Sequence, residues 1–230
     1  MTFVRRHPII VGTTAVLLVL AYYWFVFSVL SYRYRLTLEV DDPAGKTVVA
    51  GVLEPYLRHQ TRFVSGRSVV AKLRGEAIAL KLRDGRLLIA LLAGGGRPSS
   101  PDAPIRLSRE VFAPGSCQER VCSWEEMKGV SGQRPLSQNE IPALAILSDP
   151  SNPASGRYLA VKDLTSVLGG GSSVSAAIAI TNDPVTRNLR DAIPWIDNEL
   201  ELSRFWEAII HSGFVPDGSL EPETLLQRGE

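Results

Sequence analysis

The chain has 230 residues, of which 45% are hydrophobic and 21% charged, and its formal net charge is +1. These values are typical of one folded domain, or two small ones, with appendages. Without Arg5 and Arg6 the remainder carries 23 Lys and Arg against 24 Asp and Glu. It lacks the basic footprint of a nucleic-acid-binding protein, so we expect no nucleic-acid partner.

The most apolar segment is residues 8–31, which contain no charged side chain. A helix of this length spans roughly 36 Å, and the hydrocarbon core of a bilayer is about 30 Å thick. A cleaved signal peptide is the alternative, because residues 19–21 (VLA) resemble a cleavage site, but the apolar run continues beyond them. The pattern predicts a transmembrane helix over 8–31, after a flank over 1–7, with the lipid bilayer as its partner.

The charges that flank this segment decide its orientation only narrowly. Arg5 and Arg6 precede the segment, and Arg33 and Arg35 follow it, so the positive-inside comparison is nearly balanced. We expect the arrangement that is usual for one anchor before a large domain. The N-terminus would lie in the cytoplasm of a bacterium and the body in the periplasm, with one pass through the inner membrane.

Cysteine usage agrees with an oxidising compartment. Cys117 and Cys122 are the only two cysteines of the chain, and both lie in the body. A pair at such close spacing is typical of a small-loop disulfide. Two free thiols, or a redox or metal pair, are the alternatives.

The first half of the body has the pattern of β-strands. Residues 34–40 alternate apolar and polar side chains, and 46–53 and 61–70 are further short strands. Asp84-Gly85 between two apolar runs predicts a hairpin with a two-residue turn, and residues 87–92 are apolar throughout, as in a central strand. The glycine-rich stretch that follows is a loop and a candidate internal boundary near 94–104.

The last third alternates strands and helices. We expect a strand over 143–147, a helix over 161–168, a strand over 174–181 and an amphipathic helix over 196–214, whose Phe-Trp stripe faces the core. The tail over 216–230 lacks a sufficient apolar face and is expected to be disordered. The fold class is therefore α+β: a transmembrane helix, then a mainly antiparallel sheet domain over 32–215 with its helices late in the chain.

Residues 179–196 (AITNDPVTRNLRDAIPWI) contain the candidate functional residues Asp183, Thr186 and Arg187. We interpret the stretch as a joint between a strand and a helix. Asp183 would be the N-cap and Pro184 the first residue of that helix, which Pro194 ends. This interpretation assigns no role to Thr186 or Arg187.

No other pattern predicts catalysis or metal binding. The three histidines are not spaced as ligand pairs, and no Gly-x-Ser-x-Gly or Ser-x-x-Lys motif occurs. Glu125-Glu126 and Asp197/Glu199/Glu201 could supply acid and base, but solvated helix faces explain both clusters better. We therefore predict no catalytic residue, no metal and no cofactor.

Four stretches resemble a loose group of single-pass bacterial membrane proteins: SYRYRLTLEV, GEAIALKLRDGRLLIALLAG, IPALAILSDPSNPAS and ITNDPVTRNLRDAIPW. The resemblance runs from the anchor to about Trp195 and is most specific in the last third. It implies an inner-membrane anchor with an extracytoplasmic α+β body. The group has no assigned activity, so no functional residue is carried over.

Three hypotheses of function follow. The favoured one is a non-enzymatic, membrane-tethered interaction or scaffold module with an envelope protein as partner. The second is a periplasmic hydrolase acting on envelope material, to which Asp183, Thr186 and Arg187, or Glu125-Glu126, contribute. The third is a membrane-tethered small-molecule-binding domain. Polar groups converging on an apolar pocket would favour the last two, and a closed surface with one apolar patch the first.

Overall fold

The computed structural model describes residues 13, 17, 30–43, 45–62, 66–95, 98–117, 121–218 and 220–228. The predicted transmembrane helix lies outside the described residues except at 13, 17, 30 and 31. Within the described residues, no helix is both long and apolar enough to cross a membrane. The chain divides into two compact units, Met1–Leu30 with Tyr56–Lys72, and Ser31–Pro55 with Leu73–Glu230. Both sides of the candidate boundary near 94–104 belong to the second unit.

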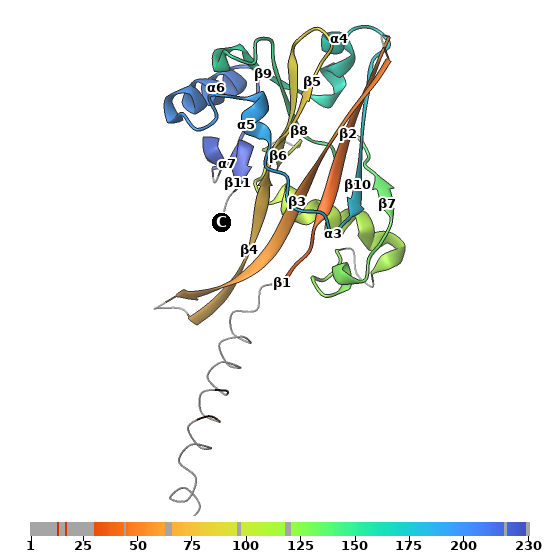
Figure 1. The fold of residues 1–230 in the computed structure, drawn as a ribbon, viewed down its shortest axis with the longest axis vertical. Helices are drawn as coiled ribbons and strands as arrows, with labels where there is room; N and C mark the ends of the chain where they lie inside the picture. Colours follow the sequence, from red (N-terminus) through yellow and green to blue (C-terminus); the bar gives the residue numbers. More distant parts are fainter. Residues whose placement is uncertain are drawn as a thin grey trace, which may run out of the picture. The chain divides into compact units, whose positions relative to one another are not determined.

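The larger sheet joins segments far apart in the sequence (Figure 1). Its strand order is β11-β4-β3-β2-β10-β7, and β1 (Leu30–Ser31) pairs with β3. The alternation predicted at residues 34–40 is confirmed, because every second side chain from Tyr34 to Val40 is buried. The strands are β2 (Tyr34–Asp42), β3 (Gly45–Arg62), β4 (Gly66–Glu76), β7 (Gln133–Pro135), β10 (Ser173–Ile180) and β11 (Gln227–Arg228).

Strand β3 is longer than the sequence predicted. It runs without interruption through residues 54–60, which we expected to separate the short strands over 46–53 and 61–70. Pro55 offers no N–H, but its carbonyl accepts a hydrogen bond from the Tyr32 amide at 3.4 Å, so the strand continues past the proline.

The smaller sheet contains the hairpin and has the order β5-β6-β8-β9. Strands β6 and β8 lie inside it and are buried along almost their whole length, as predicted for 87–92. The hairpin turn has three residues, because the Leu82 amide bonds to the Arg86 carbonyl and only Gly85 has a positive φ, +89°. A two-residue turn of type I′ needs two such residues. The strands are β5 (Ile78–Lys81), β6 (Leu87–Gly94), β8 (Pro142–Leu147) and β9 (Gly156–Leu159).

Most helices come late in the chain, as predicted. Helix α6 begins after Asn198, whose side chain accepts hydrogen bonds from the Leu200 and Glu201 amides, and it buries Phe205 beside Trp195. The expected helix over 161–168 comprises a 3₁₀ turn and α4. Helix α3 was not predicted. The helices are α3 (Ala103–Ser116), α4 (Leu164–Leu168), α5 (Leu189–Ala192), α6 (Glu199–His211) and α7 (Pro222–Leu226).

The prediction of a disordered tail over 216–230 is wrong for residues 216–218 and 220–228. Leu220, Leu225 and Leu226 are buried, and the Ala77 amide donates to the Leu226 carbonyl at 2.8 Å. Strand β11 then pairs with β4. The three leucines form no continuous stripe in the sequence, and only contact with distant segments makes their burial possible.

Cys117 and Cys122 form the predicted disulfide directly after α3. Arg109 connects this loop to the helix, because its Nε donates to the Cys122 carbonyl at 2.6 Å and its guanidinium lies 5.3 Å from the Trp124 ring centroid. The Tyr32 ring packs on Trp124, and burial raises the pKa of Tyr32 to about 12. Cys122 and Trp124 are therefore packed against α3 and the start of the sheet.

Candidate functional site

Residues 181–188, which we call the joint, connect β10 to α5. The prediction of a helix beginning at Pro184 is wrong, because α5 covers only Leu189–Ala192. The joint makes its backbone hydrogen bonds to neighbouring strands: the Thr181 amide bonds to the Arg33 carbonyl and the Thr186 amide to the Val52 carbonyl. These bonds replace the bonds within the segment that a helix would require.

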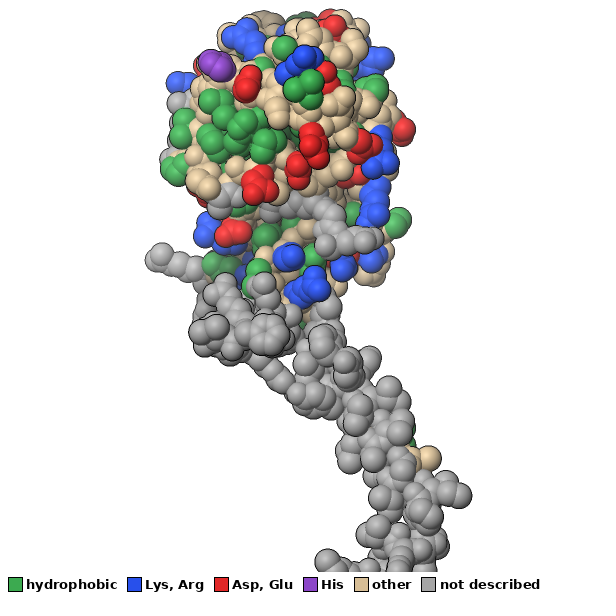
Figure 2. Space-filling view, turned by 90° about the vertical axis from the view of Figure 1, so that its left-hand side faces the viewer, with side chains coloured by type: hydrophobic (Ala, Val, Ile, Leu, Met, Phe, Trp, Pro, Cys, Tyr) green, Lys and Arg blue, Asp and Glu red, His purple; other side chains and the backbone are tan. Residues whose placement is uncertain are grey.

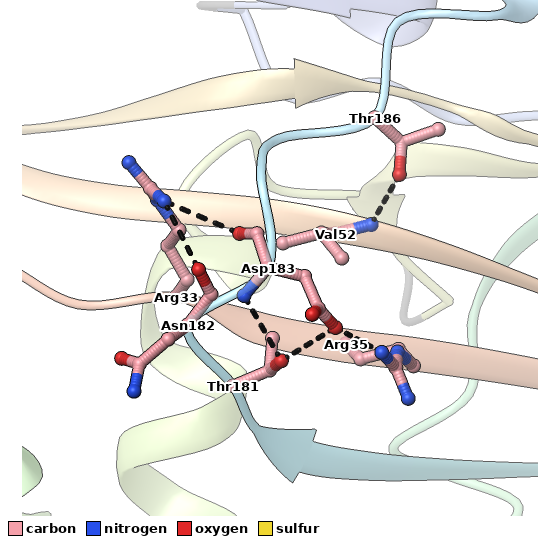
Figure 3. Close-up of polar contacts among 7 residues, drawn as sticks. All are labelled: Arg33, Arg35, Val52, Thr181, Asn182, Asp183 and Thr186. Carbon is pink, nitrogen blue, oxygen red and sulfur yellow. Dashed lines mark hydrogen bonds and ion pairs between the residues drawn. The ribbon is translucent and has the colours of Figure 1, made fainter.

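Asp183 has partners other than the helix N-terminus that we predicted for it (Figure 3). Its Oδ2 accepts a hydrogen bond from Thr181 Oγ1 at 2.7 Å and forms an ion pair with Arg35 on β2. The Thr181 hydrogen bond, and then the Arg35 guanidinium, hold the pKa of Asp183 below its usual value. A carboxylate with a lowered pKa is a weak base, so this arrangement suits anchoring of the joint better than proton abstraction.

Thr186 binds β3 through both its side chain and its backbone. The Val52 amide donates to Thr186 Oγ1 at 2.9 Å, and the Thr186 amide donates to the Val52 carbonyl at 3.2 Å. Figure 3 shows Thr186 and Asp183 at separate points along the joint. The two candidates of the joint therefore bind different strands: Thr186 binds β3 and Asp183 binds β2.

A charged network lies beside the joint. Glu54 is only 8% exposed, and its carboxylate is 3.6 Å from Arg33 Nε and 3.4 Å from Arg74 Nη1. Arg33 Nη1 also donates to the carbonyls of Asn182 and Asp183 at 3.4 and 3.3 Å (Figure 3). This network connects the joint to three segments of the larger sheet.

Arg187 does not join the other two candidates. Its side chain is exposed, and none of the hydrogen bonds or ion pairs among the described residues involves it. The functional hypothesis for Asp183, Thr186 and Arg187 therefore has no common centre in the structure, and two of the three side chains make tertiary contacts that hold the joint in place.

A different region offers groups with fewer partners. A cavity of about 390 Å³ lies between α6 and α7, with an apolar floor and carboxylates around it. Asp197 forms an ion pair with Arg190 at 3.0 Å, whereas Glu199 and Glu223 have no ion-pair partner among the described residues. The cavity is lined by Ile196, Asp197, Glu199, Leu202, Glu223, Leu226 and Gln227.

Gln227, one of the residues that line this cavity, carries an unsatisfied donor. Its Nε2 atom is buried and has no hydrogen-bond partner among the residues that the structure describes. Leaving a buried donor unpaired destabilises a fold by about 1–3 kcal/mol, so such groups are rare in native proteins.

An apolar patch lies on the same side of α6 as the cavity. Glu199, Leu202, Trp206 and Ile210 recur at three- and four-residue spacing, so they follow one side of the helix. Ile210 is 37% exposed. Figure 2 shows hydrophobic side chains gathered on the face that carries α6 and α7, with acidic side chains nearby. We call the cavity together with Trp206 and Ile210 the α6–α7 face.

Sequence reasoning missed this face for two reasons. It assigned the Phe-Trp stripe to the core, which holds for Phe205 at 1% exposure but not for half-buried Trp206. It also placed Glu223 and Gln227 in a disordered tail. The start of α7 had a local signal, because Pro222 follows Glu221 in a capping box with Thr224.

No protein-family model, no curated protein and no solved structure matches the chain.

Proposed function

We propose that this chain is a membrane-anchored, non-enzymatic interaction module of the bacterial envelope, and that its α6–α7 face binds a basic segment of an envelope protein. The observation that carries the proposal is one surface on which exposed apolar side chains adjoin a cavity with carboxylates and a buried unpaired amide. An exposed apolar patch with a polar rim is typical of a protein-binding surface.

The charge of this region supports a basic partner. Residues 189–228 contain eight Asp and Glu against three Lys and Arg. A Lys or Arg side chain in the cavity would lie near Glu199 and Glu223. Apolar neighbours would pack on Trp206 and Ile210. Complementary charge of this kind favours fast association and selects the partner.

The membrane part of the proposal concerns topology. Residues 8–31 would span the inner membrane once, with the N-terminus in the cytoplasm and the body in the periplasm. The apolar segment and the disulfide support this arrangement, since disulfides persist in oxidising compartments. Alkaline phosphatase fused to the C-terminus should be active, because it folds only when exported. An inactive phosphatase together with a fluorescent cytoplasmic reporter at the same position would overturn the topology.

A small cationic ligand is the second candidate for the α6–α7 face. The cavity volume of about 390 Å³ favours it, because small-molecule sites usually measure about 300–1,000 Å³. Native mass spectrometry of the purified full chain should then show a bound cation that the E199Q/E223Q variant loses.

Site-specific crosslinking tests the main candidate. A photoreactive benzoylphenylalanine at Ile210 in the full chain, expressed in its native membranes, should crosslink to a protein peptide rich in Lys and Arg. The E199Q/E223Q background should lower the yield about tenfold, because it removes the two carboxylates without changing the apolar patch. The same photoreactive residue at exposed Arg187 is the matched control. A crosslink to lipid or to an acidic peptide, or a yield that is insensitive to E199Q/E223Q, would contradict the proposal.

A further inference from the structure

Charge is divided unequally between the two compact units. Met1–Leu30 with Tyr56–Lys72 contains six Lys and Arg and no Asp or Glu, a net charge of +6. Ser31–Pro55 with Leu73–Glu230 contains the other 19 Lys and Arg and all 24 Asp and Glu, a net charge of −5. The whole positive excess of the chain therefore lies in the smaller unit.

Four of the six positive charges lie on one pair of strands. We call residues 56–62 of β3 and 66–72 of β4 the basic hairpin. It contains Arg58, Arg62, Arg67 and Lys72 without any acidic residue, and the side chains of Arg58 and Lys72 are exposed. Like charges on adjacent strands destabilise the pairing, so an anionic partner would stabilise this hairpin.

The basic hairpin belongs to the same unit as the uncharged segment. That unit includes Met1–Leu30, which contains most of residues 8–31, the proposed membrane anchor. If these residues enter the bilayer, the basic hairpin has a high effective concentration near lipid headgroups. Anionic phospholipids attract such basic segments, and each Lys or Arg near the surface strengthens membrane binding about fivefold.

We propose that the basic hairpin binds the headgroups of anionic phospholipids. This inference rests on the membrane anchor of the proposed function, and it adds a second lipid contact outside residues 8–31. The larger unit, with its net charge of −5, offers no comparable attraction to an anionic surface.

Hydrogen–deuterium exchange of the full chain in lipid nanodiscs tests the proposal. Backbone amides of residues 56–62 and 66–72 should exchange at least fivefold more slowly in discs of phosphatidylcholine with 30% phosphatidylglycerol than in phosphatidylcholine alone. Added 0.5 M NaCl should remove the difference, because salt screens the charges. Equal exchange in the two kinds of disc would overturn the proposal.

Two variants of equal charge separate a local effect from a general one. R58Q/R62Q/R67Q/K72Q should lose the dependence on phosphatidylglycerol. R106Q/R187Q/R190Q/R204Q removes four exposed arginines of the larger unit and should retain the dependence on phosphatidylglycerol. Equal loss of the phosphatidylglycerol dependence in both variants would overturn the assignment to the basic hairpin. The assignment to lipid would also be overturned if soluble glycerol phosphate or DNA, added to the chain in phosphatidylcholine discs, slowed exchange of the hairpin as much as phosphatidylglycerol does.

Failure of the anchor is recognised separately. A chain that does not co-elute with the discs in size-exclusion chromatography contradicts the proposed membrane anchor. The same exchange measurement, with phosphatidylglycerol vesicles added to the free protein, then tests the hairpin alone. Slower exchange of residues 56–72 on the vesicles would support the lipid contact, and unchanged exchange would reject it.

Discussion

The joint and the α6–α7 face use polar side chains in opposite ways. At the joint, Asp183 and Thr186 have partners within the domain, and the buried Glu54 lies between two arginines. On the α6–α7 face, Glu199 and Glu223 lack ion-pair partners and Gln227 Nε2 lacks a hydrogen bond among the described residues. Satisfied polar groups stabilise the fold, whereas unsatisfied ones remain available for a ligand. The comparison therefore favours the face over the joint as a binding site.

The largest effect on stability is expected for Glu54→Ala, which tests the charged network beside the joint. Removal of the carboxylate leaves Arg33 and Arg74 without their common partner, and we expect the free energy of unfolding to fall by about 2–3 kcal/mol. The loss should be smaller than in a fully buried pair because the two arginine side chains are 37% and 35% exposed. Urea denaturation followed by tryptophan fluorescence measures it. The control is Glu39→Ala, which breaks a more exposed pair with Lys46 and should change stability by less than about 1 kcal/mol.

Thr186→Val should have the next largest effect. The substitution keeps the shape of the side chain but removes the acceptor of the Val52 amide, so we expect a loss of about 1–2 kcal/mol in the same urea assay. Arg187→Ala is the matched control from the adjacent residue and should stay within about 0.5 kcal/mol of the wild type. If both variants behave alike, the joint is not held by Thr186.

Asp183→Asn should remove the part of the pH dependence of unfolding that the Asp183 carboxylate contributes in acid. Because the folded pKa of Asp183 is lowered, its stabilising effect is present above the unfolded pKa of about 3.9 and is lost as the pH falls towards the folded value. The difference in urea midpoint between wild type and variant should therefore be constant from about pH 7 to 5 and narrow below about pH 4. In Thr181→Val the acid-dependent part of the difference should be smaller and should end at higher pH, because loss of the main cause of the shift brings the folded pKa of Asp183 closer to the unfolded one. A difference that persists unchanged to pH 2.5 would contradict this role of the carboxylate.

The smallest effect, with the opposite sign, is expected for Gln227→Leu. Replacing an unpaired buried amide by an apolar group of similar size should leave stability unchanged or raise it by up to about 1 kcal/mol. Gln133→Leu, at an exposed position, controls for the change of residue type. A loss of more than about 1 kcal/mol would show that the amide has a structural partner and would end the contrast between the two regions.

Local patterns in the sequence were sufficient for several elements. The alternation at residues 34–40, the hairpin around Asp84-Gly85 and the late amphipathic helix all depend on neighbours within a few residues, and the structure confirms them, although the hairpin turn has three residues instead of the predicted two. The close spacing of Cys117 and Cys122 likewise predicted their disulfide. In each case the interaction that decides the structure lies inside one short stretch, so reading that stretch is enough.

The candidate sites depended on contacts that no short stretch contains. Asp183 had the position of a helix cap in the sequence. In the structure it pairs with Arg35, 148 residues away, and Thr186 accepts from Val52, 134 residues away, so these contacts hold the joint against the sheet. Leu225 and Leu226 looked insufficient for folding, yet the packing of α7 and the pairing of β11 with β4 order the tail and form one wall of the cavity. Periodicity determines which side of an element is apolar. Whether a polar group finds a partner is decided only when distant segments pack together.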